Sequence, residues 1–176
     1  MRRHIAVWLL AVALPVATAC GSSSSNAAQS GTAVAQAGAP SATDKAADEA
    51  ALRALYQKFP GQLMSGDTAS SSALFMDDGV EIMPGMPPTQ GRPAVAKLFA
   101  NLLASMKNLN LTMGDVVVTV ADAGDLAVVK APYRMSFDDA KGKKTEDHGT
   151  SMTVFKKVNG QWRILYDTNI SEVAPQ

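Results

Sequence analysis

Residues 150–171 read TSMTVFKKVNGQWRILYDTNIS and contain two runs in which apolar and polar residues alternate. Asn159 and Gly160 separate the runs, and this pair favours a two-residue type I′ turn because both residue types tolerate positive φ angles. The stretch therefore predicts a β-hairpin with strands at Thr150–Val158 and Gln161–Ser171. Further upstream, the same alternation predicts strands over 109–113, 116–120 and 126–137, the last interrupted by Pro132.

The preceding part of the chain has the spacing of amphipathic helices. Apolar side chains recur every three or four positions at Leu52, Leu55, Tyr56, Phe59 and Leu63. Pro60 is expected to kink or end this first helix. A short helix over 68–75, a strand over 80–83, a loop over 84–88 and a third helix opening at 91–93 follow. Helices that precede an antiparallel sheet predict an α+β domain, here spanning residues 44–174.

The composition excludes several classes of protein. The 176 residues contain 16 Lys and Arg against 16 Asp and Glu, which argues against binding to a nucleic-acid backbone. Cys20 is the single cysteine, so neither a disulfide framework nor a metal site made only of thiolates is expected. No metal motif and no cofactor motif is found in the sequence.

The N-terminus has the pattern of an export signal. Arg2 and Arg3 precede an apolar run over 5–16, which is too short for a permanent membrane span. Small residues then lead to Cys20, as in the bacterial lipobox, so residues 1–19 are expected to be a signal peptide and Cys20 the lipidated residue. A plain secreted protein is the alternative. Residues 20–43 are uncharged and predict a flexible tether, which would hold the domain at the bacterial cell envelope, on its periplasmic or outer-surface face.

The order of these elements resembles the nuclear-transport-factor-2-like superfamily, which includes SnoaL-like and ketosteroid-isomerase-like proteins. The motifs that carry the resemblance are FMDDGV at 75–80, GRPAV at 91–95 and VNGQWRILYDTN at 158–169. The resemblance implies a cone-shaped, curved antiparallel sheet wrapped around three helices, with a pocket at the open end. It also implies that a homodimer forms through the outer face of the sheet.

Two of the residues that the isomerases use are missing at the corresponding positions, and their third, an acid on a strand, has no assigned position here. The resemblance places Phe59 where those enzymes have a tyrosine, and Met83 where they have the aspartate that moves the proton. Phenylalanine has no hydroxyl to donate, and methionine has no site for a proton. Isomerase chemistry of that kind is therefore not expected.

A pocket inside the cone is expected to be lined by aromatic and methionine side chains. The residues predicted to meet there are Tyr56, Phe59, Met83, Phe99, Tyr133, Met135 and Tyr166. This set assumes that Trp162, Ile164 and Tyr166 face the helices, as their hydrophobicity indicates. With the opposite register, Asp167 would enter the cone and become a weak candidate for an acid–base residue.

Other polar residues have simpler interpretations. His148 follows two acidic residues and is expected on a solvated edge of the sheet rather than in a catalytic site. Asp77 and Asp78 precede Gly79, where a turn is more expected than an acid–base pair. The charged segment 138–144 is expected to be a solvated hairpin tip.

Three classes of function follow from the sequence. The first is an envelope-anchored lipoprotein that binds a small hydrophobic molecule without catalysis. The second is a homodimeric assembly module with a vestigial pocket. The third is a SnoaL-like enzyme that acts on a small organic substrate, although the missing isomerase residues count against it.

Replacing Cys20 with serine tests the anchor. Because serine has no thiol to accept a lipid, Cys20→Ser is expected to move the protein from the membrane fraction to the soluble fraction. The measurement is immunoblotting of fractionated cells. If Cys20→Ser stays with the membranes as the unmodified sequence does, lipidation at this residue is wrong.

Overall fold

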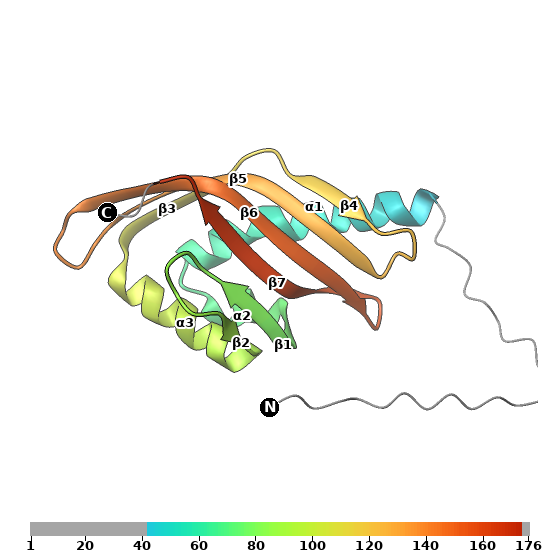
Figure 1. Cartoon of the computed structure of the whole chain (residues 1–176), viewed down its shortest axis with the longest axis horizontal. Coiled ribbons are helices and arrows are strands. Elements are labelled where there is room, and N and C mark those ends of the chain that lie inside the picture. The colour runs from blue at the N-terminus through green and yellow to red at the C-terminus, as the bar shows by residue number, and fades with distance from the viewer. Residues whose placement is uncertain (1–41, 174–176) are drawn as a thin grey trace, which may run out of the picture. The chain divides into compact units, whose positions relative to one another are not determined.

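The computed structural model describes residues 42–173, with side chains from residue 44 onward. The predicted signal peptide and nearly all of the predicted tether lie outside the described residues. Three helices and seven strands make up the described part of the chain (Figure 1). The helices are α1 Ala42–Met64, α2 Thr68–Ala73 and α3 Arg92–Ser105. The strands are β1 Phe75–Ile82, β2 Thr89–Gln90, β3 Lys107–Met113, β4 Val117–Val120, β5 Leu126–Asp138, β6 Lys144–Val158 and β7 Gln161–Ser171.

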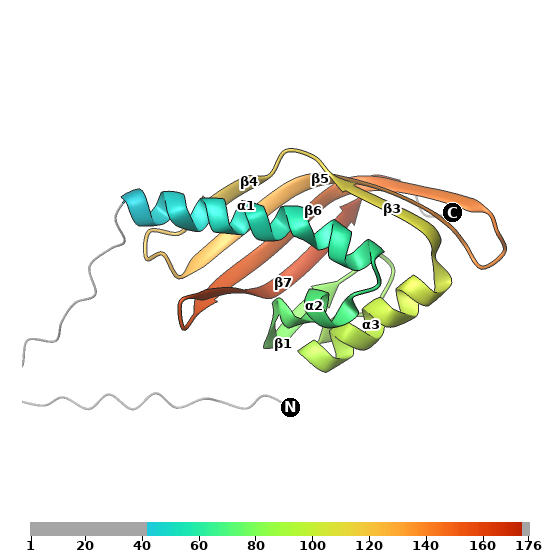
Figure 2. The same cartoon turned by 180° about the vertical axis from the view of Figure 1, so that it is seen from behind.

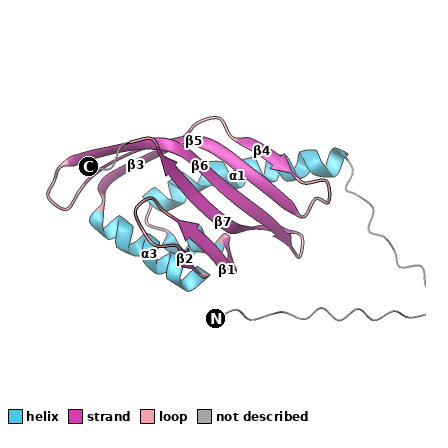
Figure 3. Cartoon of the chain, viewed as in Figure 1, coloured by secondary structure: helices cyan, strands magenta, loops and turns pink. Residues whose placement is uncertain are grey.

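The strands form one curved sheet in the order β2-β1-β7-β6-β5-β3, and β4 pairs with the part of β5 that β3 leaves free (Figure 3). Figure 2 shows α1 running across one face of this sheet, with α2 and α3 near β1. The predicted α+β architecture is therefore confirmed. One detail differs, because β1 and β7 are parallel while the other strand pairs are antiparallel. These two strands come from opposite ends of the domain, so no hairpin could join them.

The hydrophobic core lies between the helices and the inner face of the sheet. Leu52 of α1, Phe75 of β1, Val95 of α3 and Val129 of β5 are completely buried there. The ring of Phe99 packs edge-to-face on the rings of Phe59 and Phe75, with centroids 6.1 and 6.0 Å apart. This core fixes α1 and α3 against the strands, so they cover only one face of the sheet.

A polar cluster fixes the first half of α1 to the final hairpin. Asp48 accepts a hydrogen bond from the Trp162 indole nitrogen at 3.1 Å. It also forms an ion pair with Lys157, whose Nζ lies 2.6 Å from Asp48 Oδ1 and 5.3 Å from the centroid of the Trp162 ring. Asp48 and Trp162 are both buried, so the carboxylate has partners where water is excluded.

The final hairpin has the expected turn, and the first helix is longer than expected. Asn159 and Gly160 have φ angles of 51° and 76°, so the positive φ that a type I′ turn needs at both positions is confirmed. Helix α1 does not end at Pro60 but continues to Met64. The short helix α2 ends at Ala73, and Phe75 already belongs to β1.

Strand β5 runs through Pro132 without a break, although the sequence predicted an interruption. The Pro132 carbonyl accepts a hydrogen bond from the Gly114 amide at 2.8 Å. In a strand, the N–H and C=O of one residue point to the same neighbouring strand. On this side of Pro132 lies the gap between Met113, which ends β3, and Val117, which begins β4, so the N–H that proline lacks would have no strand partner there. Pro132 therefore removes no hydrogen bond to β6, and its pairing with Thr150 is kept.

Strand β7 contains one extra residue that reverses its inner and outer faces. Phe155 of β6 pairs with Ile164, but the preceding Val154 pairs with Tyr166, which leaves Leu165 without a counterpart. The predicted register is therefore correct before Leu165, where Trp162 and Ile164 are buried, and wrong after it. Beyond this β-bulge Asp167 is buried and Tyr166 is 47% exposed on the outer face.

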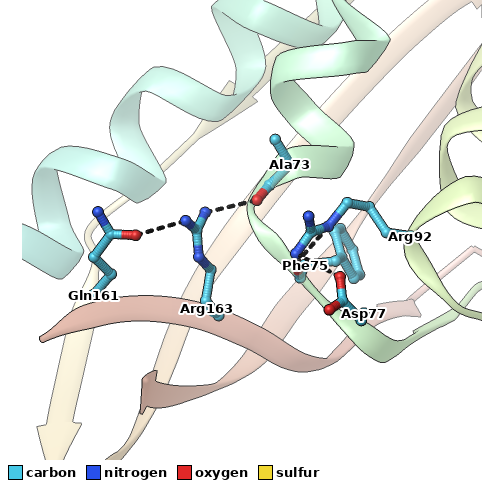
Figure 4. Close-up of polar contacts among 6 residues, drawn as sticks. All are labelled: Ala73, Phe75, Asp77, Arg92, Gln161 and Arg163. Carbon is cyan, nitrogen blue, oxygen red and sulfur yellow. Dashed lines mark hydrogen bonds and ion pairs between the residues drawn. The ribbon is translucent and has the colours of Figure 1, made fainter. Parts of the chain in front are cut away.

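Strand β1 bulges opposite the same point. Between its pairs Phe75↔Ile164 and Val80↔Tyr166 it has more residues than β7, so it bends away from its neighbour. Figure 4 shows two arginines at the start of this bend: Arg92 donates to the Phe75 carbonyl and Arg163 to the carbonyl of Ala73, the last residue of α2, at 2.9 and 2.7 Å. These carbonyls have charged donors outside the ladder, which stabilises the irregular backbone.

The outer face of the sheet carries a row of uncharged residues. Register places Thr119, Val128, Val154, Tyr166 and Val80 side by side across five strands. A homodimer through this face, which the resemblance implies, stays a prediction. None of the helices within 42–173 combines the length and the apolar character needed to cross a bilayer.

The bulge in β1 depends on a residue without a side chain. A Cβ atom on Gly79 would lie 2.7 Å from the Ile164 carbonyl oxygen, a backbone atom that has no room to move. Gly79→Ala is therefore expected to destabilise the domain by roughly 1–3 kcal/mol, as measured by urea unfolding. Gly61→Ala in α1 is the control, because nothing lies within 4 Å of its new Cβ. It should raise stability by roughly 0.5–1 kcal/mol, and equal effects of the two substitutions would contradict this account.

Candidate functional site

A cavity opens between the inner face of the sheet and the helices. The space inside it that a water-sized sphere can reach is about 120 Å³. Most of its lining is apolar, and leucines from α1, α3 and β3 contribute, among them Leu55, Leu102 and Leu111. The cavity exists because the curved sheet bends away from α1 and α3, and no side chain fills the space.

The structure brings six of the seven predicted pocket residues together around this cavity. These are Tyr56, Phe59, Met83, Phe99, Tyr133 and Met135. Tyr166 is the exception, since the extra residue Leu165 turns it to the outer face of the sheet. The same bulge brings Asp167 into the cavity lining, as the alternative register had predicted. Ligand binding by these residues stays a prediction.

The deep end of the cavity is polar. Glu81 of β1 and Asp167 of β7 are paired neighbours in the sheet and are 2% and 7% exposed. The Thr153 hydroxyl donates a hydrogen bond to Asp167 Oδ1. The Tyr56 hydroxyl, from α1, donates to Ser151 Oγ at 2.6 Å. Two carboxyl groups and three hydroxyl groups therefore meet where the rest of the wall is hydrophobic.

Burial shifts the pKa values of this group. The pKa of Glu81 lies well above its ordinary range, first because burial disfavours its charged form, and then because Asp167, to which it is hydrogen-bonded, repels that charge. Burial also raises the pKa of Asp167, while hydrogen bonds from Thr153, Glu81 and the Thr168 backbone lower it. Glu81, whose pKa is raised well above its ordinary value, is therefore the carboxyl group of this pair that retains its proton to higher pH.

Tyr56 remains a phenol across the physiological range. Burial and then the negative charge of Asp167 raise its pKa to about 12. It can therefore donate a hydrogen bond, as it does to Ser151, but it does not supply a negative charge to the cavity.

A second polar group lies on β5, β6 and β7. Asp147 accepts hydrogen bonds from the Tyr133 hydroxyl at 2.8 Å and from the Ser171 hydroxyl at 2.6 Å. Burial and the hydrogen bond to Asp147 raise the pKa of Tyr133, so it also stays protonated. Asp147 is half-buried and lines the same cavity.

The remaining polar candidates from the sequence lie away from the cavity. His148 is exposed on the outer face, opposite Arg134. Asp77 and Asp78 are exposed in the bulged part of β1, and Asp77 pairs with Arg92 at 3.1 Å. The segment 138–144 forms a hairpin tip. Within residues 42–173 no three His, Cys, Asp or Glu side chains gather in a way that could hold a metal ion.

Glu81 was missed in the sequence analysis, although the sequence contained a signal for it. Met83 was expected in the pocket, and residues two apart in a strand share a face. Placing Met83 inside therefore places Glu81 inside as well. The predicted pocket set contains only aromatic and methionine residues, and a buried glutamate without a basic partner is rare.

Solved structures of low sequence identity share this fold. A hexachlorocyclohexane dehydrochlorinase of type 3 from Novosphingobium barchaimii has a TM-score of 0.69 and 12% identity, covering 76% of this chain and 92% of its own. A ketosteroid isomerase-like protein from Erwinia carotovora atroseptica has a TM-score of 0.60 and 18% identity, covering 69% and 94%. An NTF2-like protein with a cystatin-like fold from Novosphingobium aromaticivorans has a TM-score of 0.57 and 22% identity, covering 77% and 92%.

Comparison at the level of sequence identifies a family. No curated protein sequence matches the chain. A family model of the SnoaL-like domain matches residues 52–169, from the first buried leucine of α1 to the last strand. Because this match covers more than half of the chain, the protein belongs to the family of SnoaL-like domains.

Proposed function

We propose that this domain binds a small, mainly apolar molecule in the cavity between its sheet and its helices. The observation that carries the proposal is the cavity itself, which has an apolar wall and a few convergent polar groups at its deep end. Small-molecule sites in proteins usually have this composition, because apolar walls supply affinity and a few polar groups fix orientation. The structural relatives agree with it, since one of them is a dehydrochlorinase of hexachlorocyclohexane, which is a small apolar compound.

Acid–base catalysis is the second candidate, and the carboxyl pair favours it. A general acid must hold its proton near the working pH, and burial beside Asp167 raises the pKa of Glu81 in the required direction. The positions where the resemblance would place isomerase residues hold Phe59 and Met83, which line the cavity without a titratable group. Any acid–base chemistry would therefore use Glu81 and Asp167 instead.

The anchor completes the proposal. Lipidation of Cys20 would keep the domain at the envelope, where small hydrophobic molecules concentrate in and near the lipid. The uncharged tether over 20–43 would let the domain stand clear of the membrane surface.

Filling the cavity tests the binding proposal. Leu103 of α3 lines the cavity, so Leu103→Trp places an indole where the ligand would lie. The expected result is at least a tenfold loss of affinity for a neutral apolar fluorophore such as N-phenyl-1-naphthylamine, measured by fluorescence titration of the Cys20→Ser chain without detergent. Ala100→Trp is the matched control, because it adds the same indole to an exposed site on the same helix. Equal affinities in the two variants would contradict binding in this cavity.

The pH dependence of stability tests the state of Glu81. A carboxyl group whose pKa is raised on folding contributes stability below its ordinary pKa of 4.5 and loses it as pH rises toward the folded value. Unfolding free energy should therefore fall more steeply above pH 4.5 in the unmodified protein than in Glu81→Gln, by up to about 1 kcal/mol per pH unit. Urea unfolding between pH 5 and 8 measures both slopes, with exposed Asp78→Asn as control. Parallel curves for Glu81→Gln and the unmodified protein would exclude a proton on Glu81 near neutral pH.

A further inference from the structure

The cavity carries acidic groups on three strands without basic ones. Glu81 lies on β1, Asp147 on β6 and Asp167 on β7, and all three line the same space. Among the described residues that line it, none is Lys, Arg or His. The negative charge of the lining is therefore not balanced by any basic side chain in that lining.

One oxygen atom at the deep end has no partner. Glu81 is 2% exposed, and its Oε2 is buried without a hydrogen bond. Leaving a buried polar atom unpaired costs on the order of 1–3 kcal/mol, so such atoms are rare in native structures. The cost could be avoided by an apolar residue of similar size, which would suit the leucine-rich wall. An unpaired acidic oxygen on a residue that lines a cavity therefore indicates that a ligand supplies its partner.

We propose that the ligand of this cavity is a small hydrophobic amine, whose ammonium group binds between Glu81 and Asp167. This inference rests on the proposed binding function and adds the chemical class of the ligand. An ammonium group carries three N–H donors and no acceptor, so it can bond to both carboxyl groups at once. It also supplies the positive charge that the lining lacks, and hydrogen bonds between charged partners are the strongest of their kind.

Other ligand chemistries fit the deep end less well. An alcohol of the same shape has one O–H donor and no charge, so it would satisfy Oε2 of Glu81 without balancing Asp167. A carboxylate would bring a second negative charge next to Asp167 in a buried site, which is strongly unfavourable.

The wall suits an amine as well. The rings of Tyr56, Phe59, Phe99 and Phe155 line the cavity. Aromatic faces attract cations, and the attraction grows where water is excluded. The apolar part of the amine would replace water along the leucines of α1 and α3, which supplies the hydrophobic share of the affinity.

The experiment compares three ligands that differ only in their polar group: 4-phenylbutylamine, 4-phenyl-1-butanol and 4-phenylbutyrate. Each is titrated into the Cys20→Ser full chain by isothermal titration calorimetry at pH 7, without detergent. The expected order is amine, alcohol, carboxylate, with the amine bound at least tenfold more tightly than the alcohol. This comparison uses an unchanged cavity, so it does not depend on whether any cavity variant folds.

Two cavity variants and one control test whether the two carboxyl groups cause the preference for the amine over the alcohol. Asp167→Asn and Glu81→Gln are each expected to reduce amine affinity by about tenfold and to leave alcohol affinity within about threefold. Asp78→Asn, an exposed carboxyl change on β1, should alter neither. If the alcohol binds as tightly as the amine, or if the preference survives Asp167→Asn, the amine inference is wrong while the binding function stands. If neither the alcohol nor N-phenyl-1-naphthylamine binds, the proposed binding function fails and the amine inference fails with it.

Discussion

One extra residue, Leu165, decides which side chains of the last strand reach the cavity. Without it, strict alternation from Trp162 would place Tyr166 inside and Asp167 on the outer face. The bulge is held in place by its neighbour, since β1 bends at the same point and Gly79 approaches the Ile164 carbonyl too closely for any other residue. Both carboxyl groups at the deep end therefore depend on a matched irregularity in two strands.

The sheet topology explains why the two acids are neighbours. Strands β1 and β7 come from opposite ends of the domain, yet they pair in parallel and place Glu81 beside Asp167. Each acid alone would be a buried charge without a basic partner. Side by side, they disfavour each other's charge, and burial with the charge of Asp167 raises the pKa of Glu81, so the pair holds less negative charge than two separate carboxylates would. The free-energy cost of burying the unpaired Oε2 of Glu81 remains. An apolar residue at this position would avoid that cost, so the presence of Glu81 favours a functional role.

The sequence predicted those features that depend on local patterns. The turn at Asn159-Gly160 follows from the φ preferences of its own residues, and the helices follow from apolar spacing. Six pocket residues were predicted because each lies on the apolar side of its own element. The position of Tyr166 was not predictable in this way, because no residue near Leu165 marks a bulge. Its cause lies in β1, about 85 residues earlier, where Gly79 and the arginine-bound carbonyls fix the matching bend. The interruption of β5 predicted at Pro132 was wrong for the same reason, since the gap between β3 and β4 that accommodates the proline is a property of the neighbouring strands.

The position of the acids separates this domain from the isomerase-like relatives that share its fold. The resemblance places the proton-moving aspartate of those enzymes at Met83, the last residue before the Pro84 loop. Glu81 shares a face with Met83 but lies two residues before it, where it is completely buried rather than half-buried. A carboxylate near the loop meets solvent and can exchange its proton during turnover. A carboxyl group that is completely buried beside Asp167 in the sheet is suited to holding one polar group of a ligand in a fixed place. A shift of two residues along one strand thus changes the chemistry of the cavity while the scaffold stays the same.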